Sequence, residues 1–300
     1  MTTSHNDRPL LGISLMLGFC VLIPYSDALA KLLGPHLSVG QLVTLRFIFQ
    51  GLILIPLTIA TRRHWRASGA TLGWIFARTM LQVLGIGLMY SSLMYLPLAD
   101  AVAIAFVMPF IMLLLGHWFL GEEVGARRLI ACGVGFVGTL LVVQPAFSDV
   151  GWPALLPLGV ALAFAAFMLI TRKISGATDP VGMQALSAPL ALLVLIPLHL
   201  MPLDLPMLTW VMPEADIWLL VVAMGFVGTF GHLLMTWSLR YAPAATLAPM
   251  QYLEIPAATF VGWMIFGDLP GTLASVGIAI TMASGFYIIL RERATLRQSS

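Results

Sequence analysis

Charged residues are scarce in this chain. Asp, Glu, Lys and Arg together make up 9% of its 300 residues, whereas 60% are hydrophobic and the mean hydropathy is +0.97. Soluble domains carry roughly 25% charged residues, so this composition excludes a soluble fold. The formal net charge is only +2 and no cluster of basic and aromatic residues is present, so no nucleic-acid partner is expected.

The sequence also lacks the signatures of catalysis. It contains no H-E-x-x-H pair, no nucleophile elbow, no Walker A loop and no Cys/His cluster with metal spacing. We therefore expect no catalytic residue, no metal, no cofactor and no direct use of ATP. The two cysteines, Cys20 and Cys132, lie in apolar runs and are interpreted as packing residues. The scattered His117, His199 and His232 are interpreted as packing or interface residues.

What the sequence does contain is a series of apolar runs of the length that crosses a bilayer, about 20 residues each. Polar breaks with turn-forming residues separate ten such runs. The first run is interpreted as a retained helix rather than a signal peptide, because it is too long and holds Asp27 and Lys31. The expected spans are Leu10–Leu32, Val39–Ala60, Thr71–Tyr95, Ala99–Leu120, Leu129–Val143, Trp152–Thr171, Val181–Met201, Ile217–Leu239, Ala242–Phe266 and Leu273–Leu290.

The basic residues predict the orientation. With ten spans, 12 of the 15 Lys and Arg residues fall in the tails and loops on the side of the two termini. Arg46 and Arg78 lie inside or at the edge of spans, and Lys31 lies near the opposite face. The positive-inside rule therefore predicts cytoplasmic termini in a bacterial-type inner membrane. Residues 1–9 and 292–300 are the expected cytoplasmic tails.

The two halves of the chain resemble each other. The run LILIPL at positions 52–57 recurs as LVLIPL at 193–198. Gly85 matches Gly231 at an offset of 146 (231 − 85), and Lys31 matches Lys173 at 142 (173 − 31). Each half holds five spans, an odd number, so the second copy must be inverted. We expect two inverted repeats, 10–146 and 152–291, which is the plan of many secondary transporters with a substrate site near the midplane.

Glu254 is the main candidate for substrate binding. It lies within the ninth span between Pro249 and Pro256, which predict a kink or break at the same depth. A carboxylate inside a span costs about 2.5–3.5 kcal/mol on insertion scales, so it normally faces a partner or a wet cavity. At the repeat offset Glu254 corresponds to Met108, so this charge belongs to one half only (254 − 108 = 146).

Two further charges inside spans have open alternatives. Asp27 lies four residues before Lys31 on one helix face, so it either pairs with Lys31 or lines the cavity near Pro24. Arg46 is favoured as a structural partner of a carboxylate, and the alternative is a counter-charge for a substrate carboxylate. Lys31, Arg46 and Arg78 are grouped as structural or gating charges.

Several polar and aromatic residues are candidates for the cavity wall, although helix packing explains each one as well. They are Tyr90, Ser92, Trp237, Gln251 and Tyr252, beside Asp27 and Glu254. The candidate hinges are Pro24, Pro109, Pro249 and Pro256. The G-x-G-x-x-G run at 133–138 lies inside an apolar span and is interpreted as helix packing rather than a dinucleotide site.

Two short turns carry a family resemblance. Phe119-Leu120-Gly121-Glu122-Glu123 follows the fourth span, and Ile265-Phe266-Gly267-Asp268 follows the ninth. With ten spans in two repeats, the chain resembles the EamA branch of the drug/metabolite transporter superfamily. The resemblance implies a basket-like all-α membrane bundle, with a central cavity lined largely by spans one, three, four, six, eight and nine.

Two segments suggest a narrower resemblance. The sequences SDALAK at 26–31 and APMQYLE at 248–254 are similar to segments of bacterial S-adenosylmethionine uptake carriers of that superfamily. Other members of the superfamily export amino acids, and the same scaffold would fit them.

We therefore predict an inner-membrane secondary transporter of small amino-acid-type metabolites that works by alternating access. Amino-acid export is the first choice, S-adenosylmethionine-type uptake or exchange the alternative, and an intramembrane lipid-modifying enzyme a remote third. Glu254 would hold the ammonium or sulfonium of the substrate or take a coupling proton, and Asp27 would complement it. Tyr252 and Trp237 would stack on the substrate. The expected partners are this small molecule and the lipid bilayer; the oligomeric state is open, with a monomer plausible.

Overall fold

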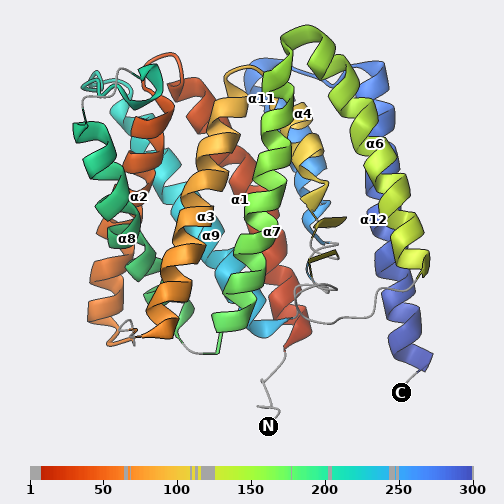
Figure 1. Ribbon diagram of the computed structural model, residues 1–300, viewed down its shortest axis with the longest axis horizontal. Coiled ribbons are helices and arrows are strands. Elements are labelled where there is room, and N and C mark those ends of the chain that lie inside the picture. Colours follow the sequence, from red (N-terminus) through yellow and green to blue (C-terminus); the bar gives the residue numbers. More distant parts are fainter. Residues whose placement is uncertain are drawn as a thin grey trace.

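A computed structural model describes residues 8–63, 67, 69–108, 110–111, 114–115, 126–176, 178–201, 205–242, 247 and 250–298 (Figure 1). Every regular element within these residues is a helix. The α-helices are α1 (Pro9–Leu33), α2 (Val39–Ala60), α3 (Ala70–Leu93), α4 (Leu98–Ala105), α6 (Ala126–Val150), α7 (Leu156–Ile174), α8 (Pro180–Leu200), α9 (Trp218–Tyr241), α11 (Glu254–Phe266) and α12 (Thr272–Gln298). Short 3-10 helices cover Trp152–Leu155 and Pro206–Leu208.

The helices match the expected spans. Seven segments of the described chain are long and apolar enough to cross a membrane, and they lie in α1, α2, α3, α6, α7, α8 and α9. The other three expected spans correspond to α4, α11 and α12; α11 and the Thr272–Ser284 part of α12 are shorter apolar helices. The chain is therefore an all-α integral membrane protein of ten spans, as the apolar runs predict.

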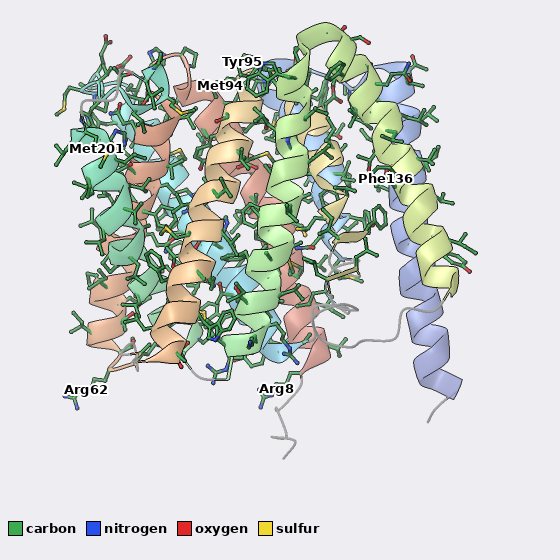
Figure 2. The ribbon with its side chains drawn as sticks, viewed as in Figure 1. Arg8, Arg62, Met94, Tyr95, Phe136 and Met201 are labelled. Carbon is green, nitrogen blue, oxygen red and sulfur yellow. The ribbon has the colours of Figure 1, made fainter. Side chains whose placement is uncertain are left out.

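The start of α1 and the end of α12 lie at one end of the bundle, here called the terminal end (Figure 1). Arg8 and Arg62 project at this end, whereas Met94, Tyr95 and Met201 lie at or toward the opposite end (Figure 2). The positive-inside rule predicts that the terminal end faces the cytoplasm.

Helix packing follows the two inverted repeats. Helix α1 packs on α9, and the repeat offset converts this pair into α7 on α3, which is also observed. The pairs α2–α8, α4–α11 and α6–α12 each join a helix to its own repeat partner. A Cβ on Gly85 would lie 2.8 Å from Phe164 of α7, and one on Gly231 would lie 2.8 Å from Ile23 of α1. The matched glycines thus allow the same close approach in both halves.

The fourth and ninth spans are interrupted at matched positions. Helix α4 ends at Ala105 and a turn follows at Phe106–Val107; in the second half a turn at Tyr252–Leu253 precedes α11 (252 − 106 = 146). Discontinuous helices of this kind form the substrate and ion sites of many transporters with inverted repeats.

The candidate hinge prolines differ in their surroundings. Pro24 lies inside α1, which continues through it as a helix. Pro256 is the third residue of α11, where its missing N–H costs no helical hydrogen bond. Pro109 and Pro249 lie outside the described residues.

The packing interpretation of the G-x-G-x-x-G run is confirmed. It lies within α6 against α12, where a Cβ on Gly138 would lie 2.5 Å from Thr281 Oγ1 and 2.8 Å from the Gly277 carbonyl oxygen. No strand precedes the run among the described residues, so the setting of a dinucleotide-binding turn is not met.

Candidate functional site

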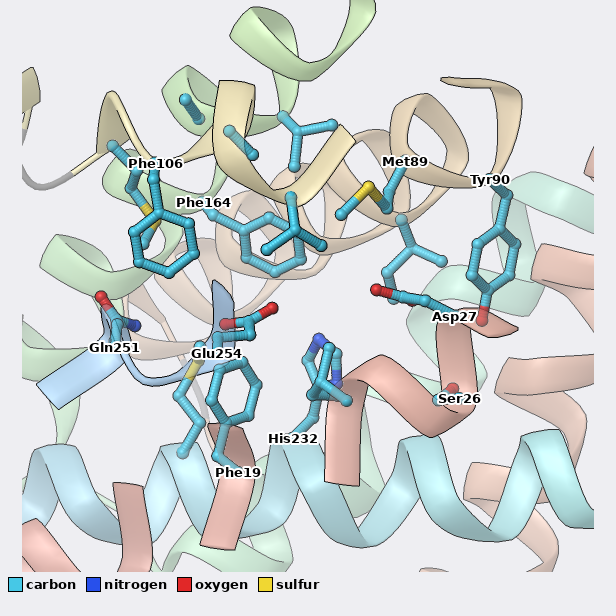
Figure 3. A pocket seen from close by; sticks show the side chains of 18 of the residues that line it. Phe19, Ser26, Asp27, Met89, Tyr90, Phe106, Phe164, His232, Gln251 and Glu254 are labelled. Atoms are coloured by element: carbon cyan, nitrogen blue, oxygen red, sulfur yellow. The ribbon is translucent and has the colours of Figure 1, made fainter. Parts of the chain in front are cut away.

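A cavity of about 60 Å³ lies among the helices near the two interruptions (Figure 3). Residues of α1, α2, α3, α4, α7 and α9 line it, together with Gln251 and Glu254 at the break of the ninth span. All six spans that the family resemblance implies as the lining (one, three, four, six, eight and nine) contribute residues, and Arg46 adds a contribution from the second span. The volume accommodates a few water molecules and is below the 300–1,000 Å³ typical of ligand pockets, so a substrate can bind only after the helices move apart.

Glu254 is a buried acid without a partner among the described residues. It is the first residue of α11 and is 8% exposed, and no hydrogen bond or ion pair joins it to any described residue. The N-terminus of a helix favours a carboxylate, since the helix dipole is positive there. Its carboxyl group points into the cavity between Phe106, Phe164 and His232 (Figure 3).

Asp27 faces the same cavity from α1. Its Oδ2 atom is buried and makes no hydrogen bond to a described residue. The carboxyl groups of Asp27 and Glu254 lie on opposite sides of the cavity and their charges interact (Figure 3). The site thus holds two acids from the two different repeats.

The alternative that Lys31 pairs with Asp27 is wrong. The Lys31 ammonium donates to the Leu96 carbonyl oxygen at 2.9 Å and forms an ion pair with Asp268 at 3.6 Å. The long lysine side chain reaches from the end of α1 to the loops at the opposite end of the bundle, where it is partly exposed rather than buried beside Asp27. Of the two alternatives for Asp27, the structure therefore supports the one in which it lines the cavity.

Arg46 is fully buried in α2, in the first repeat, and its hydrogen-bond partners lie in the second repeat. Its Nη2 donates to the Gly228 carbonyl oxygen at 2.6 Å and contacts His232 Nδ1 at 2.7 Å, both in α9. A Cβ at position 228 would lie 2.8 Å from Arg46 Nε, so only a glycine at this position leaves room for the guanidinium group. The charge of Arg46 also interacts with Asp27 and with the Tyr90 hydroxyl.

Of the remaining predicted wall residues, the structure brings only some to the cavity. Tyr90 and Gln251 line it. Tyr252 lies at the interruption, with its ring centroid 5.3 Å from that of Phe106, and is not among the lining residues.

Ser92 and Trp237 are not brought to the cavity. Ser92 donates to the Met89 carbonyl oxygen within its own helix. Trp237 packs with Leu54, Val181 and Leu233. On α9 it is turned about 200° from the cavity-lining Met235, because successive helical residues are about 100° apart.

Arg78 lies in a separate buried cluster, eight residues after the start of α3, and α3 begins at the terminal end (Figure 1). Its guanidinium donates to Thr171 Oγ1 at 2.7 Å, Ser187 Oγ at 2.9 Å and Thr236 Oγ1 at 3.1 Å. The cluster therefore ties α3 of the first repeat to three helices of the second. No carboxylate lies within ion-pair distance of Arg78 in the described part of the chain.

His232 is a cavity-lining residue that the sequence analysis did not select. It lines the cavity, contacts Arg46, and lies among the rings of Phe19, Phe164 and Phe167 at centroid distances of 6.0, 5.8 and 6.4 Å. Its partner Arg46 lies 186 residues earlier, so no local spacing indicates the contact. The one available signal is Gly228, one helical turn before His232 in a span with three glycines.

Comparison with known proteins places this geometry in a family. The profile of the EamA-like transporter family matches residues 10–144 and again 151–290. A riboflavin transporter of Vibrio cholerae is 29% identical over 218 residues, 72% of this chain and 71% of its own. An S-adenosylmethionine uptake transporter of Rickettsia prowazekii is 23% identical over 285 residues, 95% of this chain and 94% of its own. A solved crystal structure overlays with a TM-score of 0.64 at 18% identity, covering 94% of this chain and 98% of that one, and supports the fold alone.

Proposed function

Because the chain belongs to the EamA-like transporter family, we propose that it is a secondary transporter for the uptake or exchange of S-adenosylmethionine-type metabolites across the inner membrane. Both termini would be cytoplasmic, following the positive-inside rule. The two repeats would rock about the cavity, with the interrupted fourth and ninth spans at its centre.

The main support for this substrate class is the balance of charge among the side chains that line the cavity. Asp27 and Glu254 contribute two negative charges and Arg46 one positive charge, which leaves an excess of one negative charge when both acids are ionised (1 − 2 = −1). A buried charge normally requires a partner. In the described part of the chain, neither Asp27 Oδ2 nor the Glu254 carboxyl group has a hydrogen-bond partner. A ligand with one additional positive charge, such as a sulfonium, completes the balance.

The comparisons favour this substrate class over amino-acid export, the first choice from the sequence. Relatives that cover nearly the whole chain are named S-adenosylmethionine uptake transporters, in several Rickettsia species. The named substrates of these relatives and of the riboflavin transporters do not include amino acids. The relatives are named as transporters, which also disfavours a lipid-modifying enzyme.

Alternating access requires contacts that close each end in turn. At the opposite end, Lys31 of α1 joins the loop before α12 through Asp268. At the terminal end, Asp179 lies 2.9 Å from Arg63 and 3.9 Å from Arg240, which ties the loops after α2 and before α8 to the end of α9. Together with the Arg78 cluster, these contacts are the candidates for closing the two ends in turn.

Riboflavin uptake is the second candidate. Three aromatic side chains, Phe19, Phe106 and Phe164, line the cavity and could sandwich a planar heterocycle. Riboflavin transporters of three bacteria match about 72% of the chain. Riboflavin is uncharged, however, so it would leave the charges of the cavity balanced only if one of the two acids were protonated.

The test is counterflow into proteoliposomes that contain the purified protein. Labelled S-adenosylmethionine outside should accumulate when S-adenosylmethionine or S-adenosylhomocysteine is inside, and it should be recovered chemically unchanged. Accumulation of riboflavin alone would support the second candidate. Exchange among amino acids without adenosyl flux would overturn the proposal, and chemical conversion of the substrate would point to an enzyme.

A further inference from the structure

The hydrogen bonds around Arg46 fix the protonation of His232. Arg46 Nη2 carries two hydrogens and no lone pair, and its two contacts are the Gly228 carbonyl oxygen at 2.6 Å and His232 Nδ1 at 2.7 Å. Because arginine only donates, Nδ1 must accept and carries no hydrogen. The 3.2 Å approach of Nδ1 to the Gly228 oxygen is then the distance between two acceptors that share one donor group.

It follows that the ring of His232 is neutral and carries its hydrogen on Nε2. This atom is buried in the cavity wall and has no hydrogen-bond partner among the described residues. Arg46 Nη1 is likewise buried and makes no hydrogen bond in that part of the chain, although the Arg46 charge also interacts with Asp27 and the Tyr90 hydroxyl. Buried donors without acceptors are unfavourable, and in native proteins they normally meet water or a ligand. Since Arg46 and His232 touch each other, the two free donors lie on the same wall.

We propose that Arg46 Nη1 and His232 Nε2 form a donor pair that binds a carboxylate group of the substrate. The inference rests on the proposed function, whose substrate has a carboxylate as well as cationic groups. Glu254, whose carboxyl group points toward His232 in Figure 3, then receives the cationic part. Arg46 acts twice, as a ligand through Nη1 and, through Nη2, as the group that makes His232 a donor at Nε2.

The tautomer can be tested without any substrate. Protein labelled with ¹⁵N-histidine should show one neutral ring with hydrogen on Nε2 that is missing in His232→Gln. A ring with hydrogen on Nδ1, or a doubly protonated ring, would overturn the inference, because Nδ1 could not then accept from Arg46. Replacement Arg46→Met should release the constraint and shift the tautomer signal.

The ligand can be tested with a matched pair of compounds and a matched pair of variants. Decarboxylated S-adenosylmethionine keeps the adenosine, sulfonium and ammonium groups but lacks the carboxylate. Wild type should prefer the intact compound about 10- to 100-fold in transport efficiency, as expected for hydrogen bonds to a charged group. His232→Gln keeps a donor near the Nε2 position and should keep most of the preference. His232→Asn can still accept from Arg46 but has no donor there, and should lose most of it.

The outcomes separate this inference from the proposed function. Equal transport of both compounds by wild type, or equal preference in the Asn and Gln variants, would overturn the donor pair and leave the substrate class intact. Absence of flux and binding for both compounds would overturn the proposed function and the carboxylate assignment with it. A preference that survives in Gln and disappears in Asn supports both.

Discussion

The ring centroids of Phe106 and Tyr252 lie 5.3 Å apart at an interplanar angle of 44°, and each residue is the first of the turn that interrupts its span. The two positions are related by the repeat offset of 146 residues. A contact between symmetry-related residues places the pseudo-twofold axis between them, at the depth of the two breaks. Two residues further along each chain segment come Met108 and Glu254, both in the cavity wall. The scaffold is therefore symmetric at this point, but the charge is not.

Replacing Glu254 with Gln should abolish transport without unfolding the protein. The change removes one negative charge from the cavity and keeps the shape of the side chain, so binding of a cationic substrate should fall at least 100-fold. Counterflow measures the loss, and thermal unfolding in detergent checks folding. The control is Glu214→Gln, an exposed acid in the loop before α9 that should change neither. Normal flux in a folded Glu254→Gln protein would remove Glu254 from the site.

Substitution of Gly228 by Ala should disrupt the site through Arg46. The added Cβ would lie 2.8 Å from both Arg46 Nε and Ser26 Oγ, so the guanidinium must shift. We expect a destabilisation of about 1–3 kcal/mol and at least a tenfold loss of flux. The matched control is Gly73→Ala on α3, where a Cβ meets nothing within 4 Å. That change should be neutral or stabilising by about 0.5–1 kcal/mol. Equal effects of the two substitutions would contradict the packing argument.

The hydroxyls around Arg78 should be worth more than an ordinary buried threonine hydroxyl. Thr171→Val removes an acceptor from a fully buried guanidinium, which should cost about 1.5–3 kcal/mol. Thr58→Val is the control, because the Thr58 hydroxyl is equally buried but donates only to Leu54 in its own helix. Thermal or chemical unfolding in the same detergent gives the difference. If both substitutions cost the same, Arg78 does not depend on its hydroxyl partners.

The Lys31–Asp268 contact should break during each transport cycle. Both side chains are partly exposed, at 20% and 40%, so the ion pair should contribute no more than about 1 kcal/mol to stability. Linking cysteines at these two positions with a short bifunctional reagent, in a background with Cys20 and Cys132 replaced, should stop flux. Flux should return when a reducible linker is cleaved. Transport that continues in the linked protein would show that this end does not open between Lys31 and Asp268.

The sequence predicts the features that are visible within a single span. The ten apolar runs, their repeat and the interruption near Glu254 can each be recognised from residues that are close together in the sequence. The all-α membrane fold that they predict is confirmed. The family resemblance based on the turns at 119–123 and 265–268 is confirmed by the match over both repeats. Glu254, Asp27 and Gln251 could be selected because a polar side chain in an apolar run stands out wherever its helix packs.

The contacts between spans could not be predicted in the same way. Lys31 has a candidate partner four residues away but binds Asp268, 237 positions later, because the loop before α12 folds over the end of α1. His232 could not be selected as a candidate because its contact with Arg46 depends on how α2 packs on α9. Ser92 and Trp237 were selected by residue type, but only tertiary packing decides which residues of a helix reach the cavity. Trp237 is turned away from it, and Ser92 donates within its own helix.

The Arg78 cluster and the Lys31–Asp268 pair have a consequence for the kinetics of the carrier. Two identical inverted repeats would give inward-facing and outward-facing forms of equal free energy. Here one end is held by a fully buried guanidinium among hydroxyls, and the other by a partly exposed ion pair. The two open forms of the empty protein must therefore differ in population. The concentrations that half-saturate transport should differ between the two faces of the membrane, even though the direction of net flow is still set by the gradients.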